Sequence, residues 1–293
     1  MILAPLRGVT IRCFRATFAA QIREAGFTEA VTPFVSANAG VDPVKDRELR
    51  PLEGGGEPVA LTPQFIGKDP QALRQCLLKI KAAGYARADL NCGCPFPMVR
   101  NKGRGSGLLK TPDVLRRMLE AGCEAMGPGA FSVKARIGVD RPDELLALMP
   151  LLNNFPLRHL AVHARTARQM YDGACNLAAF RDVLDVAKMP VVYNGDVALP
   201  LDRQNVAFAK VHDVMVGRGF VRSLAGREDA ADLLRRYVEA SLDELHADRP
   251  VLGRMKELLS YWKDFPRWRR RWQVAKMARS TPELLLAVAD RSC

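Results

Sequence analysis

The feature of this 293-residue chain that most limits its fold is an alternation of short apolar runs with helical patterns, up to about residue 220. Several runs are rich in Val, Ile and Leu without polar residues at every second place, as expected for parallel strands buried on both faces. The eight runs are Met1–Leu6, Glu29–Val35, Val59–Gly67, Ala88–Cys92, Phe131–Ile137, Leu160–His163, Val191–Asn194 and Asp213–Gly217.

Helical stretches such as Pro70–Ala83, Thr111–Met126 and Pro142–Leu152 lie between these runs. Asp69 and Thr111 each precede a proline, a combination typical of helix starts. Eight strand-like runs alternating with helices over this length predict a TIM (β/α)8 barrel. A doubly wound open sheet is the competing fold, but its usual Gly-x-Gly-x-x-Gly turn after the first strand is absent.

The pattern changes after about residue 226. Glu228–His246, Arg254–Trp262 and Pro282–Ala289 have helical patterns with no strand-like run between them. We therefore expect an α/β barrel over residues 1–226, followed by a small all-α helical domain over residues 227–293.

The net charge of +12 and the isoelectric point near 9.6 indicate a polyanionic partner. Between Arg249 and Arg279, ten Lys and Arg stand against two acids, so this segment holds +8 of the total. A solvated helix face usually mixes the two signs, so the concentration predicts a nucleic-acid contact. Trp262, Trp268 and Trp272 lie in the same segment, but their apolar neighbours favour core packing over base stacking.

The seven cysteines are scattered, odd in number and not preceded by an export signal, so we expect reduced thiols in a cytoplasmic protein. Cys92 and Cys94 form a Cys-x-Cys pair, but no second pair stands at metal spacing, and we expect no metal. No apolar stretch is long enough to span a bilayer, so we expect no membrane contact. We expect a monomer.

Polar side chains follow nearly every predicted strand. Because a TIM barrel gathers its chemistry at the carboxyl ends of its strands, a shared site explains them best. Taken singly, His163 could be a satisfied core histidine and Lys134 part of an interior salt link. The glycine-rich turns after the last two strands present backbone N–H groups to an anion, and Arg218 could add a bidentate contact, which together predict a phosphate site.

Six motifs occur in order along the barrel. They are Ala4-Pro5-Leu6-x-Gly8-Val9-Thr10, Asp89-Leu90-Asn91-x-Gly93-Cys94-Pro95, Val133-Lys134-x-Arg136-x-Gly138, His163-x-Arg165-Thr166, Asn194-Gly195-Asp196 and Gly217-Arg218-Gly219. Together they resemble the tRNA-dihydrouridine synthase family. Arg254-Met255-Lys256-x-x-Leu259-Ser260-Tyr261 is similar to the bacterial C-type branch of that family, which modifies uridine 16.

The resemblance implies an FMN enzyme that uses NADPH to reduce the C5–C6 double bond of a D-loop uridine in tRNA. It implies that FMN is held by Pro5, Leu6, Arg7, Gln64, Lys134, His163, Asn194, Gly195, Asp196, Gly217 and Arg218. It implies tRNA contacts for Asn91, Arg165, Tyr171, Arg254, Lys256, Tyr261 and Lys276. Hydride transfer to C6 of the uracil leaves C5 in need of a proton, and Cys94, on a loop just past a strand, is the expected general acid.

Three alternatives stay open. Pro33 and Ser36 stand where C-type relatives carry an acid and an arginine, so the same reaction at another D-loop uridine is one. Another FMN barrel, such as dihydroorotate dehydrogenase, is a second, although it leaves the basic helices unexplained. A non-catalytic tRNA-binding protein is the third, against which Cys94, Lys134 and Gln64 argue.

Overall fold

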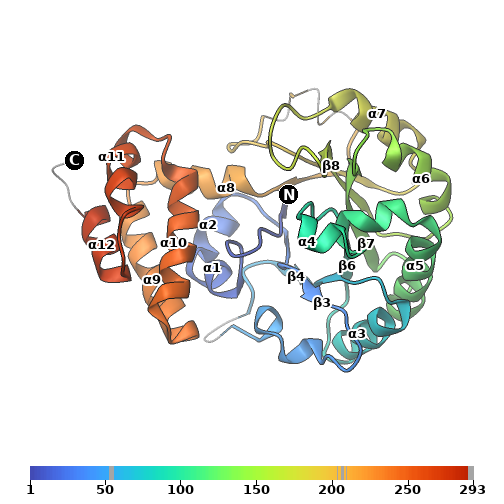
Figure 1. The fold of residues 1–293 in the computed structure, drawn as a ribbon, viewed down its shortest axis with the longest axis horizontal. Coiled ribbons are helices and arrows are strands. Elements are labelled where there is room, and N and C mark those ends of the chain that lie inside the picture. Colours follow the sequence, from blue (N-terminus) through green and yellow to red (C-terminus); the bar gives the residue numbers. More distant parts are fainter. Residues whose placement is uncertain (53–55, 203, 206–207, 209, 290–293) are drawn as a thin grey trace.

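The computed structural model describes residues 1–293 except 53–55, 203, 206, 207, 209 and 290–293 (Figure 1). Its strands are β1 (Ile2–Leu3), β2 (Glu29–Val31), β3 (Val35–Ser36), β4 (Ala60–Thr62), β5 (Gln64–Ile66), β6 (Ala88–Cys92), β7 (Phe131–Gly138), β8 (Leu160–Thr166), β9 (Val191–Asn194) and β10 (Asp213–Val216). They form one sheet in the order β3-β5-β6-β7-β8-β9-β10-β1-β2-β4, with every pair parallel.

The sheet closes on itself, because β2 pairs with β4 at one end of the order and β3 pairs with β5 at the other. Only residues 32–34 separate β2 from β3, and only Pro63 separates β4 from β5. The amide of Gln64 donates to Oγ1 of Thr32 at 3.0 Å, which bridges the two breaks. Proline has no N–H for a strand ladder, which accounts for the interruption at Pro63. Because β2 with β3 and β4 with β5 each form one interrupted strand, the ten segments make eight strands. The predicted TIM barrel is therefore confirmed.

Helices cover the outside of the barrel, with α3, α5, α6 and α7 arranged around it (Figure 1). The helices of this part are α1 (Arg12–Thr17), α2 (Ala19–Glu24), α3 (Pro70–Ala82), α4 (Pro97–Arg100), α5 (Pro112–Met126), α6 (Glu144–Leu152), α7 (Leu177–Val186) and α8 (Arg218–Ser223). Short 3-10 turns are η1 (Pro43–Lys45), η2 (Arg47–Leu49), η3 (Gly105–Lys110) and η5 (Leu224–Gly226). The three helices expected in this part are present, with ends within two residues. The side chain of Asp69 accepts from the amides of Gln71 and Ala72, as an N-cap should.

Two apolar clusters stabilise the barrel. The larger one fills the layer between the sheet and the surrounding helices and continues among the C-terminal helices. The smaller one fills the barrel below its carboxyl end and consists of Ile2, Ala4, Val31, Ala161, Val192 and Met215. Among the described residues, this cluster occupies part of the barrel interior, and a cavity lies at the carboxyl end of the strands.

Four helices follow the barrel and lie together on one side of it (Figure 1): α9 (Ala230–Leu245), α10 (Asp248–Trp262), α11 (Pro266–Ala275) and α12 (Thr281–Ala289). Helix α9 packs against α1, and α10 packs against α8. The indole N–H of Trp262 donates to the carbonyl of Val221 at 2.7 Å, and that of Trp268 to Ala225 at 3.0 Å. Both indoles are buried and Trp272 packs half-buried on the same core, so the predicted core packing of all three is confirmed.

The observed helices differ from the expected ones in two places. Helix α10 begins at Asp248, six residues before the expected Arg254. Pro250 lies in its first turn, where the backbone N–H has no helical partner to lose. Helix α11 was not expected at all, because only Trp268 and Ala275 of it are buried and its other positions are mostly charged. Among the described helices, none is both long and apolar enough to cross a membrane.

Candidate functional site

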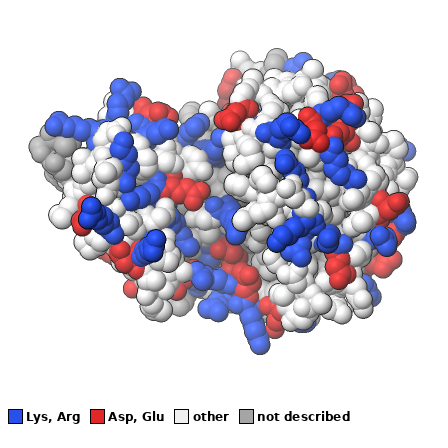
Figure 2. Space-filling model, in the orientation of Figure 1, with Lys and Arg blue, Asp and Glu red and all other residues white. Residues whose placement is uncertain are grey.

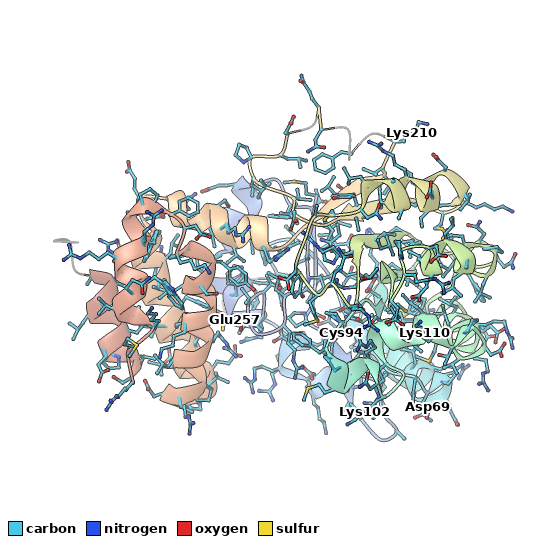
Figure 3. The ribbon with its side chains drawn as sticks, turned by 45° about the horizontal axis from the view of Figure 1, so that its top comes forward. Asp69, Cys94, Lys102, Lys110, Lys210 and Glu257 are labelled. Carbon is cyan, nitrogen blue, oxygen red and sulfur yellow. The ribbon has the colours of Figure 1, made fainter. Side chains whose placement is uncertain are left out.

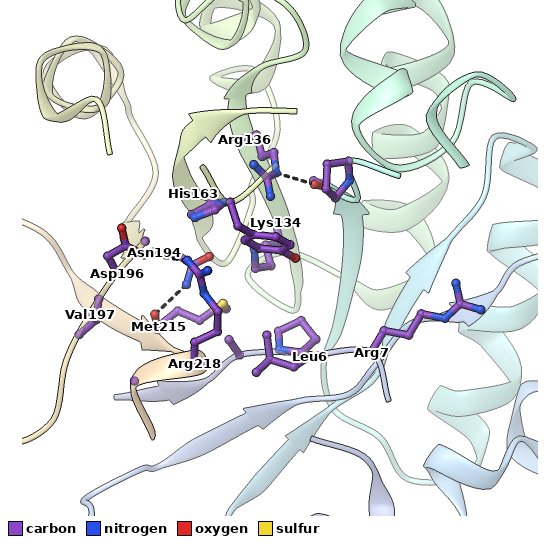
Figure 4. A pocket seen from close by; sticks show the side chains of 18 of the residues that line it. Leu6, Arg7, Lys134, Arg136, His163, Asn194, Asp196, Val197, Met215 and Arg218 are labelled. Atoms are coloured by element: carbon purple, nitrogen blue, oxygen red, sulfur yellow. Dashed lines mark hydrogen bonds and ion pairs between the residues drawn. The ribbon is translucent and has the colours of Figure 1, made fainter. Parts of the chain in front are cut away.

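A cavity of about 330 Å³ opens at the carboxyl ends of the barrel strands (Figure 4). Its wall comes from the loops after β1 and β6, from the ends of β7, β8, β9 and β10, and from Phe265 between α10 and α11. The structure brings most of the predicted site residues to this wall: Pro5, Leu6, Arg7, Asn91, Cys94, Lys134, His163, Tyr171, Asn194, Gly195, Asp196, Gly217 and Arg218. The predicted residues outside it are Gln64, Arg165, Arg254, Lys256, Tyr261 and Lys276.

Lys134 of β7 points into the cavity (Figure 4). Within the described part of the chain its ammonium has no hydrogen bond or ion pair. Burial, with the nearby charge of Arg136, lowers the pKa of Lys134 to about 8. Burial and the neighbouring cations, Arg136 first among them, hold the pKa of His163 well below its usual 6.5, so its imidazole is neutral at pH 7. The cavity therefore offers an unpaired cation and a neutral hydrogen-bonding ring to a ligand.

Arg136, which was not among the predicted site residues, ties the loop after β6 to the end of β8 and the loop that follows it. Its Nε donates to the carbonyl of Gly93 at 3.0 Å, and its Nη1 donates to Thr166 at 2.8 Å and to Met170 at 2.6 Å. Burial lowers its pKa to about 10, which still leaves it charged. Arg136 lies two residues after Lys134 on one strand, so the alternation of side chains could have indicated that both face the site.

Tyr171 lies at the rim of the cavity and is 41% exposed. The guanidinium of Arg136 lies 5.2 Å from its ring centre, and that of Arg218 lies 4.7 Å away. Other lining residues that the sequence did not indicate are Phe34, Phe96, Arg222 and Phe265. They come from loops and helix ends whose position depends on tertiary packing, so no local pattern marks them.

Asp196 holds two arginines next to the cavity. Its Oδ1 accepts from Arg218 at 2.7 Å, and its Oδ2 accepts from Arg165. Burial alone would raise the pKa of Asp196, but the hydrogen bond from Arg165 and the two positive charges outweigh it and lower that pKa. Arg165 also donates from Nε to the carbonyl of Gly173 at 3.0 Å and is almost fully buried. Its side chain therefore supports the loop after β8 from inside.

Glycines let the backbone come close at the last two strand ends. A Cβ at Gly219 would lie 1.8 Å from the carbonyl oxygen of Val197, and a Cβ at Gly195 would lie 2.7 Å from the sulfur of Cys175. Real side chains cannot be accommodated at such distances, so the β9 loop and the start of α8 pack backbone to backbone. The result is a wall of main chain beside Arg218.

Cys94 lies on the loop after β6 and lines the cavity, with 7% of its surface exposed. Its amide donates to Oδ1 of Asn91 at 2.8 Å, and its carbonyl accepts from Oγ of Ser106 at 2.9 Å. Burial raises the pKa of the Cys94 thiol, so it stays protonated at neutral pH and can give a proton. Cys92 is fully buried in the core and does not line the cavity, so the structure separates the two thiols.

Gln64 lies beneath the cavity and is fully buried. Its Nε2 donates to Oδ2 of Asp89 at 2.7 Å, and its Oε1 accepts from Nδ2 of Asn91 at 2.7 Å. Both ends of its amide are therefore used inside the protein.

The two basic residues of the α10 motif also make internal contacts. Nη1 of Arg254 lies 3.7 Å from the sulfur of Cys13 on α1, and Nζ of Lys256 donates to the carbonyl of Ala278 at 2.6 Å. The side chains thus diverge, as their spacing of two residues predicts. Arg254 joins the helices to the barrel, whereas Lys256 joins α10 to the segment before α12.

Tyr261 lies close to the cavity mouth. Burial and the charge of Glu257 raise its pKa, and Arg218 and Arg222, which both line the cavity, oppose that shift. Glu257 lies on the side of α10 that faces the barrel (Figure 3), and its Oε2 is 3.1 Å from where a Cβ of Gly8 would be.

The exposed basic residues of the C-terminal helices include Lys276, Arg269 and Arg270. Figure 2 shows more Lys and Arg than Asp and Glu on the visible face of these helices. Among the described residues, no group of three His, Cys, Asp or Glu side chains could hold a metal ion.

Comparison with known proteins adds to this geometry. The model of the dihydrouridine synthase family matches residues 2–223. The tRNA-dihydrouridine(16) synthase of Ralstonia nicotianae is 30% identical over 229 residues, which covers 75% of this chain and 69% of that protein. The tRNA-dihydrouridine synthase B of Vibrio vulnificus is 27% identical over 272 residues, with 90% and 81% covered. The old yellow enzyme homologue from Zymomonas mobilis shares the fold, with a TM-score of 0.53 at 11% identity, covering 82% and 88% of the two chains.

Proposed function

Because this chain belongs to the dihydrouridine synthase family, we propose that it reduces a uridine of tRNA to dihydrouridine, with FMN as cofactor and NADPH as reductant. The observation that carries the proposal is the presence, in one cavity, of a protonated cysteine thiol and an ammonium with no partner among the described residues. The first suits proton delivery to carbon, and the second suits an anionic cofactor.

The residues of the cavity fit FMN. The volume of the cavity, about 330 Å³, falls in the range of small-molecule sites. Leu6 and Pro5 offer an apolar surface for the flavin ring, and the unpaired cation of Lys134 suits the ring edge at which negative charge develops on reduction. Arg218 and the glycine-bordered backbone beside it suit the phosphate. The ribityl and phosphate contacts assigned to Asn194, Gly195, Asp196 and Gly217 stay proposals of the same kind.

The reaction adds a hydride and a proton across C5 and C6 of the uracil. When bound, FMN would supply the hydride, and NADPH would then reduce the oxidised FMN again. Cys94 gives the proton to C5, because burial keeps its thiol protonated until the carbon becomes basic. The positive charges of Arg7, Arg136 and Lys134 favour the thiolate that remains. His163 stays neutral and can hydrogen-bond a carbonyl group without adding a second charge.

We propose that residues 227–293 form a tRNA-binding domain. Lys and Arg on a rigid group of helices suit phosphate contacts, which fix the orientation of an RNA without reading its bases. Tyr171 offers an exposed ring at the cavity rim on which a base could stack. The preference for uridine 16 rests on the Arg254–Tyr261 motif, since relatives of both the 16-specific and the B type are similar to this chain.

The test uses the purified protein, NADPH and an unmodified tRNA transcript, with dihydrouridine located by primer extension or nucleoside mass spectrometry. We expect a yellow protein that forms dihydrouridine at position 16, and no product there when uridine 16 is replaced by cytidine. Product at another D-loop uridine would contradict the position. A yellow protein that reduces no uridine in any tRNA would contradict the reaction.

A further inference from the structure

A chain of buried hydrogen bonds links the barrel interior to the loop that carries Cys94. The strand register sets Gln64 of β5, Asp89 of β6 and Ser132 of β7 side by side in one row. All three are fully buried. Ser132 donates from Oγ to Oδ1 of Asp89 at 2.7 Å, and Gln64 donates to the other oxygen at 2.7 Å.

The chain continues from Gln64 to the loop. Oε1 of Gln64 accepts from Nδ2 of Asn91 at 2.7 Å. Oδ1 of Asn91 then accepts from the amides of Gly93 at 3.0 Å and Cys94 at 2.8 Å. Asn91 is only 7% exposed, and both ends of its amide already have partners within the protein.

The two ends of this chain fix its direction. Backbone N–H groups can only donate, so the oxygen of Asn91 must face the loop and its NH2 must face Gln64. An ionised carboxylate can only accept, so the NH2 of Gln64 must face Asp89. Both ends therefore demand the same orientation of the two amides between them, and one orientation satisfies every group. Because unsatisfied buried groups are costly, Asp89 and the loop amides together fix the orientation of both amides, and Asp89 is the side chain that can be changed to reverse it.

We propose that Asp89, Gln64 and Asn91 act as one positioning unit that holds Cys94 at the cavity wall, with Asp89 setting the direction of its hydrogen bonds. The inference rests on the proposed function in that Cys94 is the proton donor. It also assigns Gln64 and Asn91 a role inside the protein, and Asn91 has this role while it lines the cavity. Neither Gln64 nor Asp89 reaches the cavity.

A charge swap tests this unit. In Asn91→Asp, two carboxylates flank Gln64, whose amide can donate toward only one of them. Asp89→Asn combined with Asn91→Asp removes the conflict. The new amide at position 89 can donate to Gln64, which can turn and donate to the new carboxylate at position 91, and that carboxylate still accepts from the loop. Asp89→Asn alone keeps an acceptor toward Gln64, because its NH2 can face Ser132, whose hydroxyl also lies 3.2 Å from the carbonyl of Ala88.

The variants should differ in how much dihydrouridine-forming activity they retain. At pH 8 we expect Asn91→Asp to slow dihydrouridine formation about tenfold or more, the effect of one badly placed buried hydrogen bond. The double variant should recover most of that loss, and Asp89→Asn alone should lose less than Asn91→Asp. Ser132→Ala combined with Asn91→Asp is the matched control, because it removes a partner of Asp89 without giving Gln64 a donor, so it should not recover activity.

The pH dependence gives a readout that a merely structural role would not move. Asp89 is ionised above about pH 6, the value to which burial raises its pKa against the hydrogen bonds of Ser132 and Gln64 and the charge of Lys134; Glu29 raises it further. In Asn91→Asp the conflict is relieved only while one carboxyl holds a proton. The ratio of its rate to the wild-type rate should therefore fall as pH rises from about 6 to 8. In the double variant this ratio should not change.

A second readout does not depend on tRNA. Alkylation of Cys94 by iodoacetamide, followed by peptide mass spectrometry, should differ from wild type in Asn91→Asp and return toward it in the double variant. Recovery in both readouts supports the proposal. Recovery of alkylation without recovery of activity supports the positioning unit and shows that the proposed role of Cys94 as proton donor is wrong. A double variant no better than Asn91→Asp in alkylation, including one that fails to fold, overturns the positioning unit.

Discussion

The guanidinium of Arg218 lies 4.7 Å from the ring centre of Tyr171, at the rim of the cavity. Because Arg218 is also ion-paired to Asp196, the contact holds the ring over the end of the barrel where the β9 and β10 loops meet. A half-exposed ring beside fixed cations suits a nucleic-acid base, which can stack on it.

Removing the aromatic ring of Tyr171 should therefore weaken tRNA binding, whereas a substitution that keeps the ring should not. We expect Tyr171→Ala to raise the Kd for tRNA about fivefold or more, since stacking of one base on an aromatic ring contributes about 1–3 kcal/mol. Tyr171→Phe keeps the ring and is the matched control, which should stay within about twofold of wild type. Fluorescence anisotropy with a labelled tRNA measures both, and equal affinities for the Ala and Phe variants would contradict the stacking role.

Cys94→Ala should lower the rate of dihydrouridine formation by a factor of about a hundred or more, because general acid catalysis contributes that much to the rate. Reduction of the flavin by NADPH should continue, because the thiol acts on the uracil. Cys92→Ala is the control: this thiol is buried away from the cavity, so the change should have a mild effect. Stopped-flow absorbance follows the flavin and nucleoside analysis follows the product, and similar rates for the two variants would refute the assignment between the thiols.

The charge of Lys134 should appear in the pH profile. Its pKa is lowered to about 8 by burial and by Arg136, so the ammonium is present below that pH and is lost as pH rises through it. We expect the rate of uridine reduction to fall on the basic side with a midpoint near pH 8, and Lys134→Arg to move this limb to higher pH. Lys134→Ala should lower the rate on the order of a hundredfold, more than it lowers flavin content. An alanine variant as active as wild type would exclude the role.

Two double variants separate direct tRNA contact from internal support in the C-terminal helices. Arg269→Ala with Arg270→Ala removes exposed charges, so we expect weaker tRNA binding, a smaller salt dependence and an unchanged unfolding temperature. Arg254→Ala with Lys256→Ala removes contacts to Cys13 and Ala278, so we expect a lower unfolding temperature together with weaker and misplaced modification. Unaltered tRNA affinity in both would show that the basic segment serves another partner.

Much of the fold could be predicted from the sequence, because buried parallel strands leave uninterrupted apolar runs and each run here became a strand of the barrel. The polar residues after those runs could be assigned to one site for the same reason, since a barrel brings its strand ends together. The break at Pro63 and the length of α10 depend on local backbone details that the apolar pattern does not record.

The internal roles of Gln64 and Lys256 could not be predicted. Gln64 meets Asp89 only through the register of β5 against β6, and Lys256 meets Ala278 only because α12 folds back beside α10. A sequence shows which side chains carry polar groups, whereas the pairing of those groups depends on how distant segments are placed.

The proposed reaction and the role of Cys94 can be tested together by measuring dihydrouridine in tRNA from a strain that lacks this gene. The strain is complemented either with the wild-type gene or with one carrying Cys94→Ala, and tRNA nucleosides are mapped by mass spectrometry. We expect the wild-type gene to restore dihydrouridine at one D-loop position, position 16, and we expect the Cys94→Ala gene not to restore it, although the variant protein is present and yellow. Restoration by both genes, or by neither, would contradict this expectation.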